Sequence, residues 1–197
     1  MKLKIKLLQL IFLLYILNSC EAQETKVEIY DPLTNYLTYL PSGFQKLDEN
    51  KTNRALNLGK KTLEEKTNLT IQIDDLKPNI FQKDVNNYFI INVKKYDEKI
   101  DGDYNEAVTE YNNTIKETFK QAYENAKISD KTSKIKIDNV EFTKYLLSVV
   151  TPNQVDMKVV NYATFKNNND LAISVIYLDN EIGEEIVKSI ETAKFKK

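Results

Sequence analysis

The chain has 197 residues, of which 42% are hydrophobic and 29% are charged. This composition is typical of one globular domain with at most a short additional segment. The 28 basic and 29 acidic side chains give a formal charge of -1, which argues against nucleic-acid binding. With no histidine and one cysteine, the chain supplies no imidazole base, no histidine metal ligand and no internal disulfide. We therefore expect neither an enzyme nor a bound cofactor.

The amino terminus is typical of an export signal. Lys2, Lys4 and Lys6 precede an apolar run over residues 7–17. A helix that crosses a membrane needs about 20 apolar residues, so this run is too short to span and fits the hydrophobic region of a signal peptide. We expect residues 1–19 to be removed.

Cys20 directly follows this apolar run. Residues 17–19 together with Cys20 resemble a bacterial lipobox, in which the cysteine is lipidated and becomes the first mature residue. Lipidation of Cys20 would anchor the protein to a membrane of the cell envelope. The alternative is ordinary cleavage after Ala22, which would release a soluble protein into the periplasm or the medium.

The mature chain carries more acid than base. Removal of residues 1–19 takes away three lysines and no acidic residue, leaving 25 basic and 29 acidic side chains and a formal charge of -4. Anionic lipid weakly repels such a surface, so membrane attachment would depend on acyl chains rather than on a basic face. We expect residues 20–35 to form a polar tether and residues 36–197 a single domain.

The first half of the domain predicts several strands. Residues 36–40 read as a strand that ends in turn residues at 41–43. Residues 51–66 are ambiguous and include a possible short helix. Alternation over 69–73 predicts a half-buried strand, and the more continuous apolar run at 88–93 predicts a more central one.

The clearest element is a helix over residues 104–126. Apolar side chains recur there at steps of three and four residues and form one stripe. Asp103 can cap the first turn and Glu106 can return the bond. The stripe consists of Tyr104, Ala107, Val108, Tyr111, Ile115, Phe119 and Ala122.

Strands with short connections follow, and a second helix ends the chain. The predicted strands lie around 135–137, at 142–150, at 155–165 and at 171–177, with turns at 138–139, 152–153 and 167–170. Asn180 can cap a helix over 181–192, and Phe195 would hold the end on the sheet. The order predicts an α+β fold: an antiparallel sheet of five to seven strands with both helices packed on one face.

Candidate chemistry is sparse. Asp101, Asp103 and Asn105 match the opening of a calcium loop, whose alternate oxygen ligands suit Ca²⁺. The sixth position is Glu106 and the twelfth is Asn112, where that motif has glycine and glutamate. We interpret these acids as the start of a helix, where its dipole favours negative charge, and we expect no metal.

Two further patterns leave alternatives open. The aromatic residues on predicted strands either fill the core or, in part, form an exposed patch for a partner. These residues are Tyr88, Phe89, Tyr145, Tyr162 and Phe165. A pair of carboxylates for glycoside cleavage leaves no local signature, so a hydrolase stays the least favoured alternative.

Residues 37–44 form a strand that ends in Pro-Ser-Gly-aromatic, and residues 135–142 form a hairpin followed by two long strands, a helix and Phe195. This order of elements resembles PsbP-like domains, a superfamily that includes DcrB-like envelope lipoproteins. Asn139 stands where the hairpin usually has glycine. The resemblance implies a sheet-and-helix accessory module that binds other proteins and carries no catalytic residues.

These observations favour a non-catalytic lipoprotein of the bacterial cell envelope that acts as a protein-binding module of a membrane-associated assembly. A soluble periplasmic inhibitor or immunity protein is the alternative. We expect a membrane partner through the lipid anchor and a protein partner whose contact residues the sequence does not identify.

Overall fold

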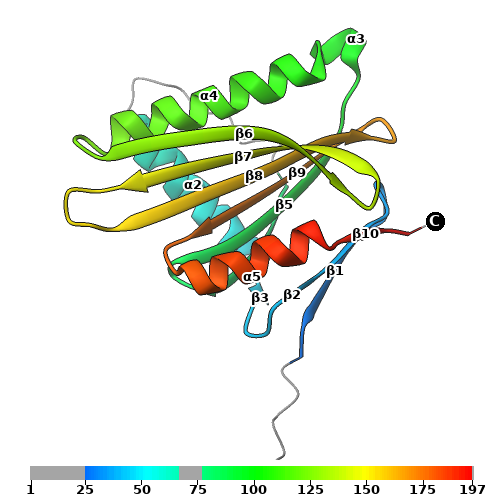
Figure 1. The fold of residues 1–197 in the computed structure, drawn as a ribbon, viewed down its shortest axis with the longest axis horizontal. Helices are drawn as coiled ribbons and strands as arrows, with labels where there is room; N and C mark the ends of the chain where they lie inside the picture. The colour runs from blue at the N-terminus through cyan, green and yellow to red at the C-terminus, as the bar shows by residue number, and fades with distance from the viewer. Residues whose placement is uncertain (1–24, 67–76, 197) are drawn as a thin grey trace, which may run out of the picture.

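The computed structural model describes residues 25–66 and 77–196. Its centre is a seven-stranded sheet in the order β3-β4-β5-β9-β8-β7-β6, and every neighbouring pair is antiparallel (Figure 1). The strands are β3 (Gln45–Lys46), β4 (Asn79–Asp84), β5 (Asn87–Lys95), β6 (Lys127–Ile137), β7 (Val140–Val150), β8 (Asp156–Lys166) and β9 (Asn169–Tyr177). The predicted α+β class with five to seven antiparallel strands is confirmed.

A second, smaller sheet joins the two ends of the described chain. It has the order β1-β2-β10, with β1 (Val27–Asp31), β2 (Tyr36–Leu40) and β10 (Lys194–Phe195). The pairing of β10 with β2 confirms that Phe195 holds the chain end: its ring lies 5.6 Å from that of Tyr36 and 6.2 Å from that of Phe142, between centroids.

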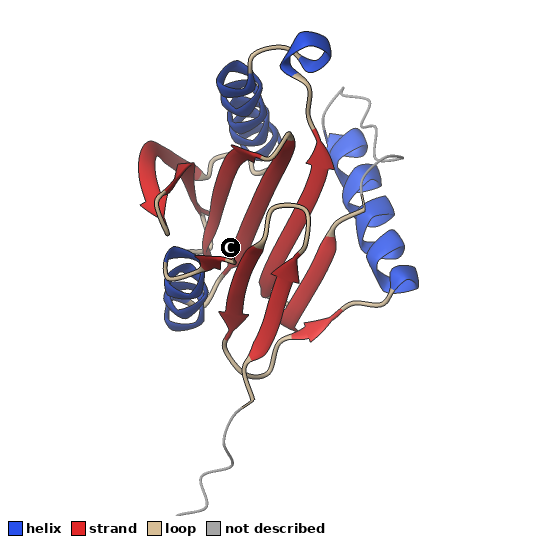
Figure 2. Cartoon of the chain, turned by 90° about the vertical axis from the view of Figure 1, so that its right-hand side faces the viewer, coloured by secondary structure: helices blue, strands red, loops and turns tan. Residues whose placement is uncertain are grey.

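The helices lie on the outside of the strand layer, as the view in Figure 2 shows. They are α2 (Glu49–Lys66), α3 (Glu98–Asp101), α4 (Tyr104–Ala122) and α5 (Asn180–Glu191). The sequence predicted that α4 and α5 pack on one face of the large sheet. They lie on opposite faces instead (Figure 1). Because alternate side chains of its strands are apolar on both faces, each face needs a cover.

The face under α5 holds the larger core. Ile186 and Ile190 of α5 are fully buried against this face, together with side chains of the small sheet such as Leu40. The large sheet contributes five side chains that are at most 1% exposed, as is typical of a hydrophobic core: Phe89, Phe142, Tyr162, Ile173 and Val175.

The face under α4 holds a smaller core. Tyr145, Leu147 and Val149 of β7 contact Ile115 and Phe119 of α4. Nearer the start of α4, a separate cluster contains Tyr96, Tyr104 and Val108. The predicted stripe therefore lies on the buried side of α4, with two differences: Tyr111 is 54% exposed, and the polar residues Asn112 and Thr118, outside the stripe, are buried.

Several boundaries differ from the predicted ones. Val27–Asp31, assigned to the tether, forms β1 because Val27 and Ile29 alternate on one side and pair with β2. The helix predicted to end at 126 ends at Ala122, and Asn125 adopts a left-handed φ of 65° before β6 begins. The strand predicted at 69–73 lies outside the described residues.

Helix caps and tight turns follow the local sequence. The Asp103 carboxylate accepts a bond from the Glu106 backbone N–H at 2.9 Å, as predicted. The cap of α5 is Asp179 rather than Asn180, with bonds from the N–H groups of Glu181 and Ile182. The β6–β7 turn at Asp138 and Asn139 has φ values of 46° and 66°, the left-handed geometry of tight hairpins.

Candidate functional site

The residues of the possible calcium loop are not arranged around a common centre. The Asp101 carboxylate accepts a bond from the backbone N–H of Asp97 at 2.8 Å, while Asp103 caps α4. The Asn105 side-chain oxygen accepts from Nζ of Lys134 at 3.0 Å. Within the described residues, no group of three or more His, Cys, Asp or Glu side chains is placed to hold a metal ion. Only the Asp103 carboxylate thus serves the entry into α4, while the Asp101 and Asn105 oxygens are engaged by Asp97 and Lys134.

Cys20 lies outside the described residues, so its lipidation stays a prediction. Among the residues that are described, no helix is both long and apolar enough to cross a membrane.

Most of the strand aromatics fill the core. Phe89, Tyr145 and Tyr162 are at most 2% exposed, and Phe165 is 38% exposed at the sheet end where it meets the rings of Tyr96 and Tyr104. The two helices on opposite faces leave little of this aromatic surface open.

An exposed aromatic surface occurs instead on the outer side of the small sheet. We call it the tyrosine face; it consists of Glu28, Tyr30, Tyr39 and Lys196. Tyr30 and Tyr39 are 43% and 46% exposed. Strand alternation places both outward, because Ile29 and Thr38 between them point into the core.

Local contacts hold the two tyrosine rings. The Tyr30 hydroxyl donates to the side-chain oxygen of Asn35 at 3.0 Å, and Nζ of Lys196 lies 4.4 Å from the Tyr30 ring centroid. Tyr39 hydrogen-bonds to the Glu28 carboxylate, which raises the pKa of its phenol above the ordinary value. Two rings fixed in this way present apolar surface at a low cost in side-chain entropy.

A groove of about 430 Å³ borders the tyrosine face where β2 meets the end of α5. Tyr39 and the backbone region around Pro41 form one wall, and Ser189 and Thr192 of α5 form the other. Its charged lining is Lys26, Glu185, Lys188 and Lys194, three bases against one acid. The groove beside the tyrosine face therefore carries more basic than acidic side chains, although Lys194 pairs with Asp138 at 3.5 Å and the whole chain has a formal charge of -1.

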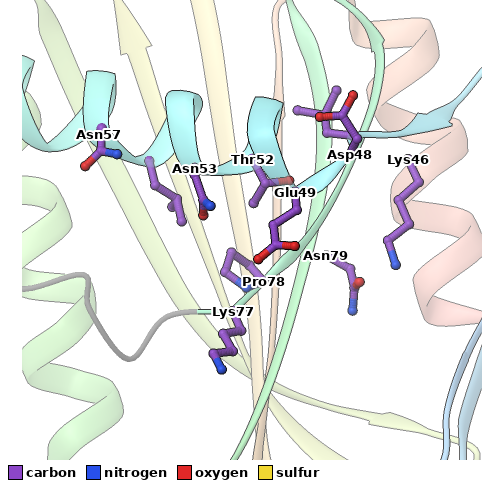
Figure 3. A pocket seen from close by; sticks show the side chains of 11 residues that line it. Lys46, Asp48, Glu49, Thr52, Asn53, Asn57, Lys77, Pro78 and Asn79 are labelled. Atoms are coloured by element: carbon purple, nitrogen blue, oxygen red, sulfur yellow. The ribbon is translucent and has the colours of Figure 1, made fainter.

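A second groove lies between the start of α2 and the start of β4, with a volume of about 730 Å³ (Figure 3). Figure 3 shows its lining as mixed polar side chains, among them Lys46, Glu49 and Lys77. Asp48 is already engaged, since it accepts from the Lys51 backbone N–H at 2.8 Å and so caps α2. We assign this groove no chemistry.

A third cavity, of about 230 Å³, lies between α4 and the large sheet. Its floor is a row of short side chains in register across four strands, namely Asn92 of β5, Ala172 of β9, Ala163 of β8 and Thr143 of β7. Because these side chains are short, α4 passes over them without filling the space. The roof is formed by Tyr104, Ala107, Val108, Tyr111 and Asn112.

The next row of the sheet brings two further polar side chains into this cavity. Asn161 of β8 pairs with Ser174 of β9 on one side and with Tyr145 of β7 on the other. Asn161 is 5% exposed, and neither its Nδ2 nor its Oδ1 has a hydrogen-bond partner in the protein. The Tyr145 hydroxyl is also without a partner, and burial raises the pKa of that phenol to about 12.

At the end of the cavity, the Tyr104 hydroxyl donates to the Asp170 carboxylate at 2.8 Å. Burial raises the pKa of Asp170 above its ordinary value, although the bond from Tyr104 and the charge of Lys94 oppose this. Of the described residues that line the cavity, Asp170 alone is acidic. The two facing acids that a glycoside hydrolase needs are not brought together in this cavity.

The cavity residues were not singled out from the sequence. A signal was present: Asn161 interrupts the apolar run from Val159 to Ala163 at a position where a central strand is buried on both faces. The pairing of Tyr104 with Asp170 joins residues far apart in sequence and leaves no local pattern.

No family model matches the chain, and no curated protein matches it in sequence. Its fold is similar to the solution structure of cyanobacterial PsbP (CyanoP) from Synechocystis, with a TM-score of 0.56 and 8% identity over 90% of this chain and 98% of that one. A crystal structure of a protein from Bacteroides thetaiotaomicron gives a TM-score of 0.48 and 11% identity over 89% of this chain and 50% of that one.

The fold and its comparisons define a class: the protein has a PsbP-like fold, an α+β domain with a central antiparallel sheet. The resemblance inferred from the order of elements is thereby confirmed at the level of the fold.

Proposed function

We propose that the protein is a non-catalytic lipoprotein of a bacterial cell envelope, anchored through Cys20, that binds another membrane-associated protein through the tyrosine face. The observation that carries the proposal is the position of this face. It exposes two fixed tyrosine rings, and it lies on the strands nearest in sequence to Cys20.

The length of chain before β1 limits how far the tyrosine face lies from the anchor. Six residues separate Cys20 from Val27. An extended chain spans at most about 3.6 Å per residue, so β1 begins within about 25 Å of a lipidated Cys20. β1 begins at the end of the molecule opposite to α4 (Figure 1). Anchoring would hold the tyrosine face close to the membrane and α4 away from it.

The chemistry of the face favours an acidic protein surface as its partner. Tyrosine is enriched at the centres of protein interfaces, where its ring is buried and its hydroxyl is paired. Lys196 lies over the Tyr30 ring, and Lys26, Lys188 and Lys194 line the adjoining groove together with Tyr39. A partner with carboxylates around an apolar centre complements this arrangement.

Replacement of Cys20 tests the anchor. In the native host, Cys20→Ala is expected to abolish incorporation of radiolabelled palmitate and to move the protein from the membrane fraction to the soluble fraction. Unchanged fractionation together with unchanged labelling would refute lipidation at Cys20. Cleavage after Ala22, shown by sequencing of the mature amino terminus, would do the same.

Replacement of the two tyrosines tests the docking surface separately. The full chain is cross-linked in intact envelopes and its adducts are identified by mass spectrometry. The double variant Tyr30→Ala/Tyr39→Ala is expected to lose the adduct. In the wild type, the yield of the adduct should fall as the salt concentration is raised. Tyr123→Ala, at the far end of α4, is the matched control and should keep it. The proposal would be contradicted if only the control lost the adduct, or if neither variant lost it.

Binding to anionic lipid instead of protein is the other outcome of this surface. If the tyrosine variant loses affinity for vesicles of phosphatidylglycerol and the wild type forms no protein adduct, the face is a lipid contact. That result would overturn the proposed protein partner.

A further inference from the structure

Asn161 is placed at a cost that the protein alone does not offset. A buried primary amide that has lost its water and gained no partner destabilises the folded state, and native structures pair nearly all such groups. Asn161 sits in the interior of β8, at a position that faces α4 between Tyr145 of β7 and Ser174 of β9. An apolar residue there would stabilise the fold, so the amide is suited to a ligand rather than to the core.

We propose that the cavity beneath α4 binds a small planar molecule with a cis-amide edge, such as a lactam, recognised by the side chain of Asn161. A primary amide presents a donor and an acceptor side by side. A ligand whose N–H and C=O lie on the same edge pairs with both at once. This complementarity holds for either orientation of the Asn161 amide, because exchange of its oxygen and nitrogen only reverses the ligand.

The size and walls of the cavity limit the ligand to about one ring. A cavity of about 150 Å³ holds benzene in a protein interior, so the space of about 230 Å³ here admits one ring with small substituents. Tyr104 and Tyr111 from α4 provide aromatic surface, and Ala163 and Ala172 leave room on the sheet side. Flat ligands gain most from such walls.

The charges at the cavity favour a neutral ligand. The Asp170 carboxylate already accepts from the Tyr104 hydroxyl, and the positive charge of Lys94 partly balances its negative charge. A charged ligand would lose its hydration at Asn161 without an unpaired counter-charge to replace it. The proposal goes beyond the envelope-docking function and does not depend on the lipid anchor or on the tyrosine face.

A pair of probes that differ in one hydrogen-bond donor tests the recognition. The full chain, isotope-labelled and purified in detergent micelles, is titrated with 2-pyridone and with N-methyl-2-pyridone while its amide signals are followed by NMR. 2-Pyridone should shift the side-chain NH₂ signals of Asn161 saturably. The N-methyl compound keeps the ring but loses the donor, and its affinity should be at least about tenfold lower.

Two variants locate the binding. Asn161→Leu should lose affinity for 2-pyridone by at least about tenfold, because it removes both hydrogen bonds. It should also unfold at a higher temperature than the wild type when no ligand is present, which shows that it folds. Ala172→Val narrows the cavity while Asn161 stays in place, and it should weaken both probes alike. Asn153→Leu, at an exposed turn, is the matched control and should change neither affinity.

Two results would overturn the proposal. If both probes bind equally well to wild type and to Asn161→Leu, the cavity does not recognise an amide edge. If neither probe shifts the Asn161 signals and those signals show contacts to long-lived water, the amide is a structural water site instead of a ligand site.

Discussion

Gly183 allows α5 to approach the large sheet closely. It is a buried residue in the first half of this helix, and a Cβ atom built on it would overlap three ring carbons of Tyr177. Tyr177 is 7% exposed on β9 and belongs to the core under α5. The ring would have to move to make room for the new methyl group. We therefore predict that Gly183→Ala destabilises the domain, although alanine is the better helix former.

The magnitude follows from two opposing effects. Replacement of glycine by alanine inside a helix favours folding by about 1 kcal/mol. Overpacking a core with one extra carbon costs about 1–3 kcal/mol, and overlap with three atoms of a rigid ring places Gly183→Ala at or above the upper end of that range. The net loss is about 2 kcal/mol, which lowers the unfolding temperature of a domain this size by about 4–8 °C.

The assay is chemical and thermal unfolding followed by circular dichroism, with Glu184→Ala as the matched control on the exposed side of the same turn. The control should change stability by less than about 0.5 kcal/mol. In a Tyr177→Ala background the ring is absent, so Gly183→Ala should become stabilising by about 1 kcal/mol. A wild-type background in which Gly183→Ala raises the unfolding temperature would refute the close contact.

Three further predictions concern other contacts. Burial raises the pKa of Asp170 above 3.8, so the folded state binds this proton more tightly and loses stability as pH rises through the raised pKa. Asp170→Asn should therefore make the free energy of unfolding, measured at several pH values from about 4 to about 7, depend less on pH. Phe195→Ala should cost about 2 kcal/mol in urea unfolding because it frees β10 from Tyr36, and an unchanged midpoint would contradict this. Tyr162→Phe removes a 3.0 Å bond to Glu191 and should cost about 1 kcal/mol, measured in the same way.

The predictions from sequence were most accurate where one local pattern decides the structure. The stripe over 104–122 defines α4 and its buried side, and the left-handed turn at 138–139 joins two strands as expected. The strand-like residues at 36–40 with the turn residues after them located β2, and the continuous apolar run at 88–93 located β5. The strand and turn signals each lie within about ten consecutive residues and the helix stripe within 19, and no distant contact is needed to interpret them.

The arrangement of helices about the sheet could not be derived in the same way. The central strands carry apolar side chains on both faces, so their sequences do not state which face receives α4 and which receives α5. β1 was missed because only Val27 and Ile29 mark it among polar neighbours. Its pairing with β2 joins residues 5 to 13 positions apart in sequence and becomes visible only in the folded register.

The cavity has the same origin. It depends on the coincidence of short side chains from four strands, and a shift of one residue in any pair would move Ala163 or Ala172 to the face under α5. The space under α4 is therefore set by the register of the strands, whereas Asn161 can be identified in the sequence itself. Only their combination makes a candidate site.

The PsbP-like fold itself decides neither proposal, because a fold shared at 8% identity hosts different sites in different proteins. What this chain adds is a separation of surfaces. The tyrosine face lies on the small sheet, whereas the cavity lies between α4 and the large sheet, and the two share no residue. Substitutions at sites that share no contact act additively. Asn161→Leu should therefore leave the envelope adduct intact, and Tyr30→Ala/Tyr39→Ala should leave 2-pyridone binding unchanged. Coupling between the two would mean that docking and ligand binding belong to one mechanism.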